Sequence, residues 1–257
     1  MTPEKPPILF LHSIFGTPEL YTPWLEFFRA TGYECRAATM PGRNPTDREV
    51  LSASGVAEFF EAALAAYDSL DAPAVVVGHS IGGLLGQKLA AVRDVRALVL
   101  LASIPAGVLW PQLRSLPHLV PILPAVLAGR PVLPNARTMR VVPLSTLPTA
   151  EQDELVPKLV PDSGKAFRAM TLGTPSVRAN RRSVRCPVLV VSGGSDRNVA
   201  PWISRRIAKR YGAEHQMYPD MPHWIVAESG LQQVAPPVLQ WLERVLASGH
   251  ECELAAE

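Results

Sequence analysis

The sequence predicts an α/β protein with a mostly parallel sheet of about six strands and helices on both faces. Short apolar runs alternate along the chain with longer segments of helical periodicity, which is typical of parallel strands joined by helices. With 47% hydrophobic and 19% charged residues, the 257-residue chain has enough apolar side chains for a large core. A proline-rich segment interrupts the alternation in the middle of the chain, and we interpret it as an insertion.

Six short apolar or β-prone runs are the expected strands. They are Ile8–His12, Glu34–Ala38, Ala74–Val77, Ala97–Ala102, Val188–Ser192 and Glu214–Tyr218. Helical spacing between and after them predicts helices at Leu20–Ala30, Val50–Leu70, Ile81–Ala91, Pro201–Tyr211 and Pro236–Ala247. The last two segments begin with proline, which is favoured at the first position of a helix.

The insertion spans residues 104–185. Eleven of the 26 prolines of the chain lie between Pro105 and Pro161, so this part cannot form one continuous helix or a central strand. Its leucine and valine content is too high for a solvated linker. We therefore predict a cap of short helices over the carboxyl edge of the sheet, with residues 1–103 and 186–257 forming the core.

Gly78-His79-Ser80-Ile81-Gly82 follows an apolar strand and precedes a predicted helix. A chain that reverses so abruptly drives the apex residue, Ser80, toward positive φ and requires very small residues two positions before and after it. Both of these positions hold glycine. The pattern is the G-x-S-x-G nucleophile elbow, in which the serine is exposed at the end of a strand.

A serine hydroxyl needs a base, and the base needs an acid to orient it. Asp196 follows the strand at 188–192 in a glycine-rich loop, and His223 is the histidine that follows the last strand. We predict these two as the acid and the base, with Asp220 as the substitute acid. The predicted backbone donors to an oxyanion are the amides of Ile81 and Ile14, with Ser13 as the next choice to Ile14.

Charge and motifs exclude several other classes of protein. The formal net charge is +2 without a long basic run, so nucleic-acid binding has no electrostatic support. The start of the chain lacks a signal-peptide pattern and no apolar stretch is long enough to span a membrane, so we expect a cytoplasmic protein. The sequence has no Cys/His spacing typical of a metal site, and it has no G-x-G-x-x-G motif or P-loop. We therefore expect no metal and no cofactor.

These motifs resemble the α/β-hydrolase superfamily, in its capped group of esterases, lipases, thioesterases and non-haem haloperoxidase-like proteins. Besides the elbow, the resemblance rests on Leu11–Gly16, Met40-Pro41-Gly42, Gly193–Asp196 and Pro222-His223, and it covers nearly the whole chain. Two departures are visible. The first-strand loop reads His12-Ser13 where the family usually has His-Gly, and the chain has no room for the usual first hairpin.

The resemblance implies an α/β-hydrolase fold and hydrolysis of a carboxylic ester or thioester through an acyl-enzyme on Ser80. The alternatives are acyl transfer, elimination chemistry with His223 as base, and a non-catalytic ligand-binding pseudohydrolase. The apolar insertion favours an apolar or polyketide-like small molecule as substrate, with Phe15, Trp110 and Leu113 in its binding pocket. We also expect the cap to set substrate choice without contributing to bond breaking. The oligomeric state is left open.

Overall fold

A computed structural model describes residues 5–44 and 47–254, with side chains described as far as residue 248. It contains one six-stranded sheet in the order β2-β1-β3-β4-β5-β6, and every neighbouring pair is parallel. The strands are β1 (Ile8–Leu11), β2 (Cys35–Ala38), β3 (Val75–His79), β4 (Ala97–Leu101), β5 (Val188–Gly193) and β6 (Glu214–Tyr218). The predicted α/β class and strand number are confirmed.

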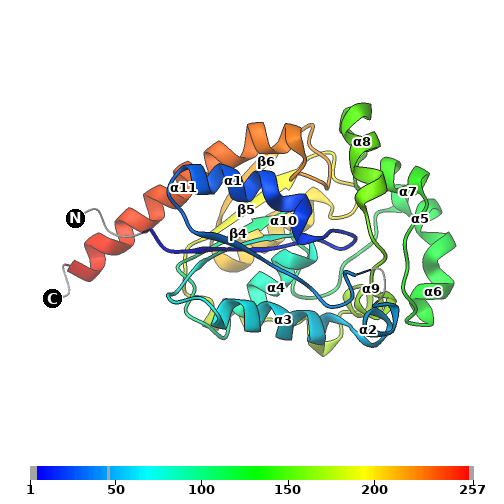
Figure 1. Cartoon of the computed structure of the whole chain (residues 1–257), viewed down its shortest axis with the longest axis horizontal. Coiled ribbons are helices and arrows are strands. Elements are labelled where there is room, and N and C mark those ends of the chain that lie inside the picture. Colours follow the sequence, from blue (N-terminus) through cyan, green and yellow to red (C-terminus); the bar gives the residue numbers. More distant parts are fainter. Residues whose placement is uncertain (1–4, 45–46, 255–257) are drawn as a thin grey trace.

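Helices pack on both faces of the sheet. Figure 1 shows α1 (Thr22–Ala30) and α11 (Glu228–Leu254) on one side, and α3 (Val56–Asp68) and α4 (Ile81–Leu89) on the other. A further helix, α10 (Pro201–Tyr211), lies beside α4, where the Tyr211 hydroxyl donates to Gln87 at 3.1 Å. The central strands are buried on both faces, as expected for a parallel sheet between helix layers.

Two predicted helices differ from those observed. The segment Val50–Leu70 forms two helices, α2 (Arg48–Ala53) and α3, because Ser54 is extended and the Gly55 amide, at the start of α3, donates to the Glu58 carboxylate at 2.7 Å. The last helix does not begin at Pro236; α11 starts eight residues earlier and carries Pro236 and Pro237 inside it. Apolar side chains of α11 on either side of the two prolines, among them Val234, Val238 and Trp241, are buried, and this burial offsets the lost backbone hydrogen bonds.

Residues 104–185 contain short helices at the carboxyl end of the sheet. The α-helices are α5 (Leu116–Leu119), α6 (Leu123–Leu127), α7 (Ala136–Val141), α8 (Thr149–Leu155) and α9 (Gly164–Leu172). Short 3₁₀ turns join them, including η2 (Leu113–Ser115) and η3 (Val120–Ile122). In Figure 1, α5 to α8 gather at one end of the molecule, opposite the two chain ends. Whether this segment is a separate cap domain stays a prediction.

Among the described residues, none of the helices is long and apolar enough to cross a membrane. These residues also contain no group of three or more His, Cys, Asp or Glu side chains placed to hold a metal ion.

Candidate active site

Ser80 occupies the turn between β3 and α4 with φ 57° and ψ −116°. Its amide donates to Leu101 O at 3.0 Å, and its carbonyl accepts from Ile104 N at 3.0 Å. The flanking glycines allow the chain to approach itself closely. A Cβ on Gly82 would lie 2.0 Å from Leu11 O, and a Cβ on Gly78 would lie 2.3 Å from Gly82 O. The serine is therefore held in a strained conformation that only this glycine pair permits.

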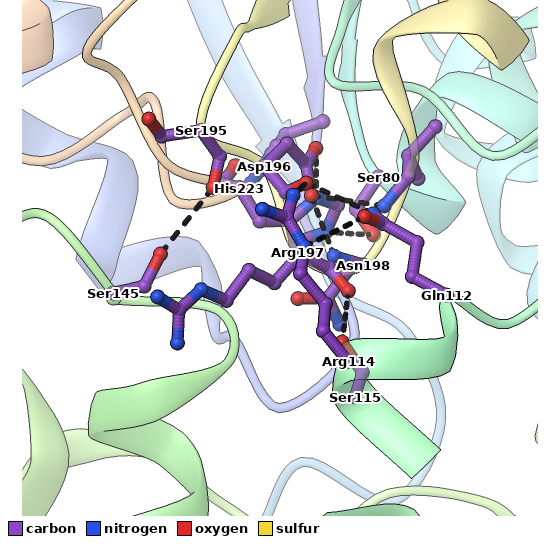
Figure 2. Close-up of polar contacts among 12 residues, drawn as sticks. Ser80, Gln112, Arg114, Ser115, Ser145, Ser195, Asp196, Arg197, Asn198 and His223 are labelled. Atoms are coloured by element: carbon purple, nitrogen blue, oxygen red, sulfur yellow. Dashed lines mark hydrogen bonds and ion pairs between the residues drawn. The ribbon is translucent and has the colours of Figure 1, made fainter.

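Three side chains from three loops form a continuous line of hydrogen bonds. The Ser80 hydroxyl lies 2.9 Å from His223 Nε2, and His223 Nδ1 lies 2.8 Å from Asp196 Oδ2. All three residues are buried. Figure 2 shows the side chains of Ser80, His223 and Asp196 converging from the ends of different strands. In this arrangement the hydroxyl donates to Nε2 and the opposite ring nitrogen donates to the carboxylate.

The Asp196 carboxylate is oriented by its own loop. Its second oxygen, Oδ1, accepts from Asn198 N at 2.7 Å and from Val199 N at 2.9 Å. Backbone amides that bond to an ionised carboxylate stabilise it and fix its direction. Asp220, the substitute acid, has a different position: its carbonyl accepts from the Thr146 hydroxyl at 2.6 Å. The bond to His223 Nδ1 belongs to Asp196.

The first-strand loop supplies one of the two predicted oxyanion amides. Ser13 N donates to the Tyr21 hydroxyl at 2.9 Å, so this amide is already used. Ile14 lines the same cavity as Ser80 and His223, and no acceptor within the described part of the chain bonds to its amide. Ile81 N is the first amide of α4, directly after Ser80. Of these two residues, the geometry favours Ile14 as the second backbone donor to an oxyanion.

A buried ion pair between Arg43 and Asp162 holds this loop. Asp162 Oδ2 lies 2.7 Å from Arg43 Nη1 and accepts from Phe15 N at 2.9 Å. Phe15 has a positive φ of 64°, and its carbonyl accepts from Val160 N at 3.0 Å. Residues of the 104–185 segment thus fix the loop that carries Ile14. Asp162 lies in a proline-rich stretch without a motif, so the sequence carried no signal for its role.

A second buried network links the first-strand loop to His223. The Tyr21 hydroxyl accepts from Ser13 N and donates to His79 Nδ1 at 2.7 Å, and His79 Nε2 donates to the carbonyl of His223 at 2.9 Å. Burial, followed by the proximity of His223, lowers the pKa of His79 to about 3, so its ring is neutral. This matches a tautomer that donates at one nitrogen and accepts at the other. The elbow motif specifies no residue type at the position of His79, so it gave no signal for this role.

The 104–185 segment also contacts the loop of Asp196. Gln112 Nε2 and Arg114 Nη2 both donate to the main-chain carbonyl of Asp196, at 2.9 and 2.8 Å. The hydroxyl of buried Ser115 donates to Arg197 O at 2.7 Å. Figure 2 shows these side chains reaching the acid loop from one side, with Ser145 on the other side near Ser195. The carbonyl of Asp196 is thus bound by the insertion, while its carboxylate faces His223.

A cavity of about 100 Å³ opens above Ser80 and His223. Apolar side chains dominate its wall, and Phe15 is among them as predicted. The other apolar lining residues are Ile14, Ile104, Leu109, Pro111, Leu119, Val142, Pro143, Phe167, Met170 and Trp224. Gln112, Ser115, Thr171, Arg197 and Asn198 add polar groups.

Trp110 and Leu113 lie outside this cavity, which corrects their assignment to the pocket. Their side chains are 61% and 84% exposed. Leu109, Pro111, Gln112 and Ser115 of the same stretch line the cavity instead. Trp110 instead borders a separate surface hollow together with Trp202. The sequence shows that this stretch is apolar but does not show which of its sides faces inward.

A parallel sheet with a serine at a strand-to-helix elbow, and with acid and base on later loops, is the arrangement of the α/β hydrolases. The model of the alpha/beta hydrolase family matches residues 8–236, and the chain belongs to this family. No curated protein matches the sequence.

Solved structures of this fold are similar to most of the chain. A monoacylglycerol lipase from Paleococcus ferrophilus is 18% identical, with a TM-score of 0.70 over 94% of this chain and 96% of the other. A carboxylesterase from Nitrososphaera gargenis is 17% identical, with a TM-score of 0.71 over 95% and 92%. A methylesterase from Arabidopsis is 14% identical, with a TM-score of 0.66 over 92% and 98%. At these identities the similarity establishes the fold.

Proposed function

We propose that the protein is a serine hydrolase that cleaves a carboxylic ester or thioester of an apolar small molecule. The observation that carries this proposal is the line of hydrogen bonds from the Ser80 hydroxyl through His223 to Asp196. His223 takes the proton of Ser80 as the hydroxyl attacks the substrate carbonyl, and then gives it to the leaving group. Water, activated by the same imidazole, releases the acyl group in the second half of the reaction.

The surroundings of Ser80 supply two further functions, stabilisation of the oxyanion and binding of the substrate. The amides of Ile14 and Ile81 stabilise the oxyanion, and the amino end of α4 adds a favourable dipole. The largely apolar wall of the cavity, with Leu109, Leu119 and Phe167, binds the hydrocarbon part of the substrate. Exclusion of water by the same wall strengthens the electrostatic interactions at the carbonyl.

Labelling with a tagged fluorophosphonate, followed by mapping of the adduct, tests whether Ser80 is an activated nucleophile. Turnover of a short-chain p-nitrophenyl ester then separates hydrolysis from elimination chemistry that needs only the base. We expect Ser80→Ala and His223→Ala each to lower kcat by about 10⁴- to 10⁶-fold, and the double variant to lose little more, because the residues act as a unit.

Asp196→Asn is expected to lower kcat severely but less than the other two changes. Near-normal turnover by Ser80→Ala would rule out the acyl-enzyme and leave His223 acting as a base alone. Labelling of a different serine would show that the elbow does not carry the nucleophile.

A further inference from the structure

The outward side of residues 113–127 is apolar along its whole length. We call Leu113, Leu116, Val120, Leu123 and Leu127 the outer stripe. Their side chains are between 38% and 84% exposed. They recur at alternating spacings of three and four residues, and the helical turns η2, α5, η3 and α6 follow one another without a gap. These five side chains therefore lie along one side of a nearly continuous helical segment.

The opposite side of this segment is apolar as well. Val126 is buried against the core, and Leu119 lines the cavity above Ser80. From 113 to 127 the only side chains with polar groups are Arg114, Ser115 and His118. A helix that is apolar on all sides belongs in a protein interior or at a lipid boundary, but this one lies at the end of the molecule (Figure 1). The outer stripe therefore requires an apolar surface outside this chain to cover it.

The charged residues nearest the outer stripe along the sequence have one sign. Residues 104–150 contain four arginines and no Asp or Glu. Exposed Arg130 follows α6 directly, and Arg168 Nη1 donates to the carbonyl of Leu127 at 2.7 Å, so cationic groups flank one end of the stripe. Arg114 lies at the other end. Basic residues beside an apolar helical face are the pattern of segments that bind anionic membranes.

We propose that the outer stripe docks the protein on an anionic lipid surface. Protein interfaces mix apolar groups with aromatic and hydrogen-bonding ones, whereas the outer stripe consists of leucine and valine alone. In the docked state the aliphatic side chains enter the acyl-chain boundary, and Arg130 and Arg168 contact phosphate groups. Because Leu119 of the same segment lines the cavity, the bound lipid surface lies next to the candidate active site. The inference does not depend on the reaction that Ser80 performs.

Co-sedimentation with lipid vesicles tests the proposal without an activity assay. The full-length protein is mixed with vesicles of phosphatidylcholine alone, or with about a quarter phosphatidylglycerol added to give an anionic surface. We expect binding to the anionic vesicles that decreases as salt is raised. Val120→Ser/Leu127→Ser should weaken this binding at least tenfold, and Arg130→Gln/Arg168→Gln should reduce the preference for phosphatidylglycerol.

The matched control is Val92→Ser/Met217→Ser, which removes two comparably exposed apolar side chains outside the insertion. It should bind like the unmodified protein, and thermal unfolding checks that all variants are folded. Equal binding by the two double variants would overturn the proposal, as would the absence of binding to anionic vesicles. A dimer in solution that Val120→Ser/Leu127→Ser dissociates, without vesicle binding, would show that the stripe pairs two copies of the chain instead.

Discussion

Ser80 takes a backbone conformation that costs free energy, and its neighbours hold it there. The carbonyl of Ser80 accepts three amides, from Gly83, Leu84 and Ile104, and its own amide donates to β4. A positive φ in a residue other than glycine typically costs on the order of 1–3 kcal/mol, which these bonds offset. The same conformation directs the hydroxyl to His223. The position of the Ser80 hydroxyl thus depends on the backbone around it as much as on its side-chain partners.

Gly82→Ala tests how tightly the elbow is packed. The added Cβ would lie 2.0 Å from Leu11 O, a contact that requires the main chain to move. We expect the free energy of unfolding to fall by about 3 kcal/mol or more. Gly107→Ala is the control, because no atom lies within 4 Å of its added Cβ. A loss of stability no larger in Gly82→Ala than in Gly107→Ala would show that the elbow is not close-packed.

Tyr21→Phe tests the network between Ser13, His79 and His223. Loss of the Tyr21 hydroxyl leaves the buried Ser13 amide and His79 Nδ1 without their partner, so the free energy of unfolding should fall by about 2 kcal/mol. Because these partners adjoin Ile14 and His223, we also expect kcat for a short-chain ester to fall about tenfold or more.

Tyr67→Phe provides the matched control for this change. The Tyr67 hydroxyl also accepts a backbone amide, Ala74 N at 3.0 Å, and donates to the carbonyl of Asp94, but it lies at the other end of β3. Tyr67→Phe should therefore lower the free energy of unfolding and leave kcat unchanged. If both variants have unchanged kcat, the Tyr21 network supports the fold and does not position the site.

At the scale of whole elements, the insertion is bound to the loops that carry the candidate catalytic groups. It bonds to the acid loop through Gln112, Arg114 and Ser115, and to the first-strand loop through Asp162. Because of these contacts, we expect the segment to influence the chemical step, through the geometry of the loops of Asp196 and Ile14, in addition to selecting substrates. The expectation that it only selects substrates stays a prediction until this is measured.

Gln112→Leu tests this role. The change replaces the amide group by methyl groups and removes one of the two donors to the Asp196 carbonyl, so the acid loop is held less firmly. For an acetate ester too small to reach the outer wall of the cavity, we expect kcat to fall about three- to tenfold with little change in KM. Gln232→Leu, on an exposed turn of α11, is the control. An effect on long-chain esters alone would mean that Gln112 only lines the cavity.

The features that the sequence predicted are those specified by local patterns. Strand runs, the elbow and the order of Ser80, Asp196 and His223 depend on spacing and on residues next to one another in the chain. Their partners depend on tertiary packing: Asp162 reaches Phe15 across 147 positions, and Tyr21 reaches His79 across 58. No periodicity reports such contacts. The break at Ser54 and the continuation of α11 through Pro236 likewise follow from packing that overrides local preference.

At the scale of the whole molecule, buried neutral histidines couple stability to pH. Burial lowers the pKa of His79 to about 3, and burial followed by Arg43 lowers that of His12 to about 4. His12 Nε2 accepts from Met40 N and Nδ1 donates to Ser13 O, so its neutral ring is bonded at both nitrogens. In the unfolded chain both rings take up a proton near pH 6.5. Between that pH and the native pKa values, the unfolded state binds more protons and gains stability relative to the native state.

The protein is therefore expected to lose stability as the pH falls below about 6.5, and each of the two histidines should contribute about 2 kcal/mol of that loss at pH 5. Urea unfolding at pH 7 and pH 5 measures the difference. In His79→Asn the drop between the two pH values should be smaller than in the unmodified protein by about 2 kcal/mol, although the variant starts from lower stability. Ser80→Ala keeps both histidines and should retain the full drop. An identical drop in His79→Asn and the unmodified protein would mean that His79 is protonated at pH 5 in the native state, in which case its bond to Tyr21 would have to reverse or break.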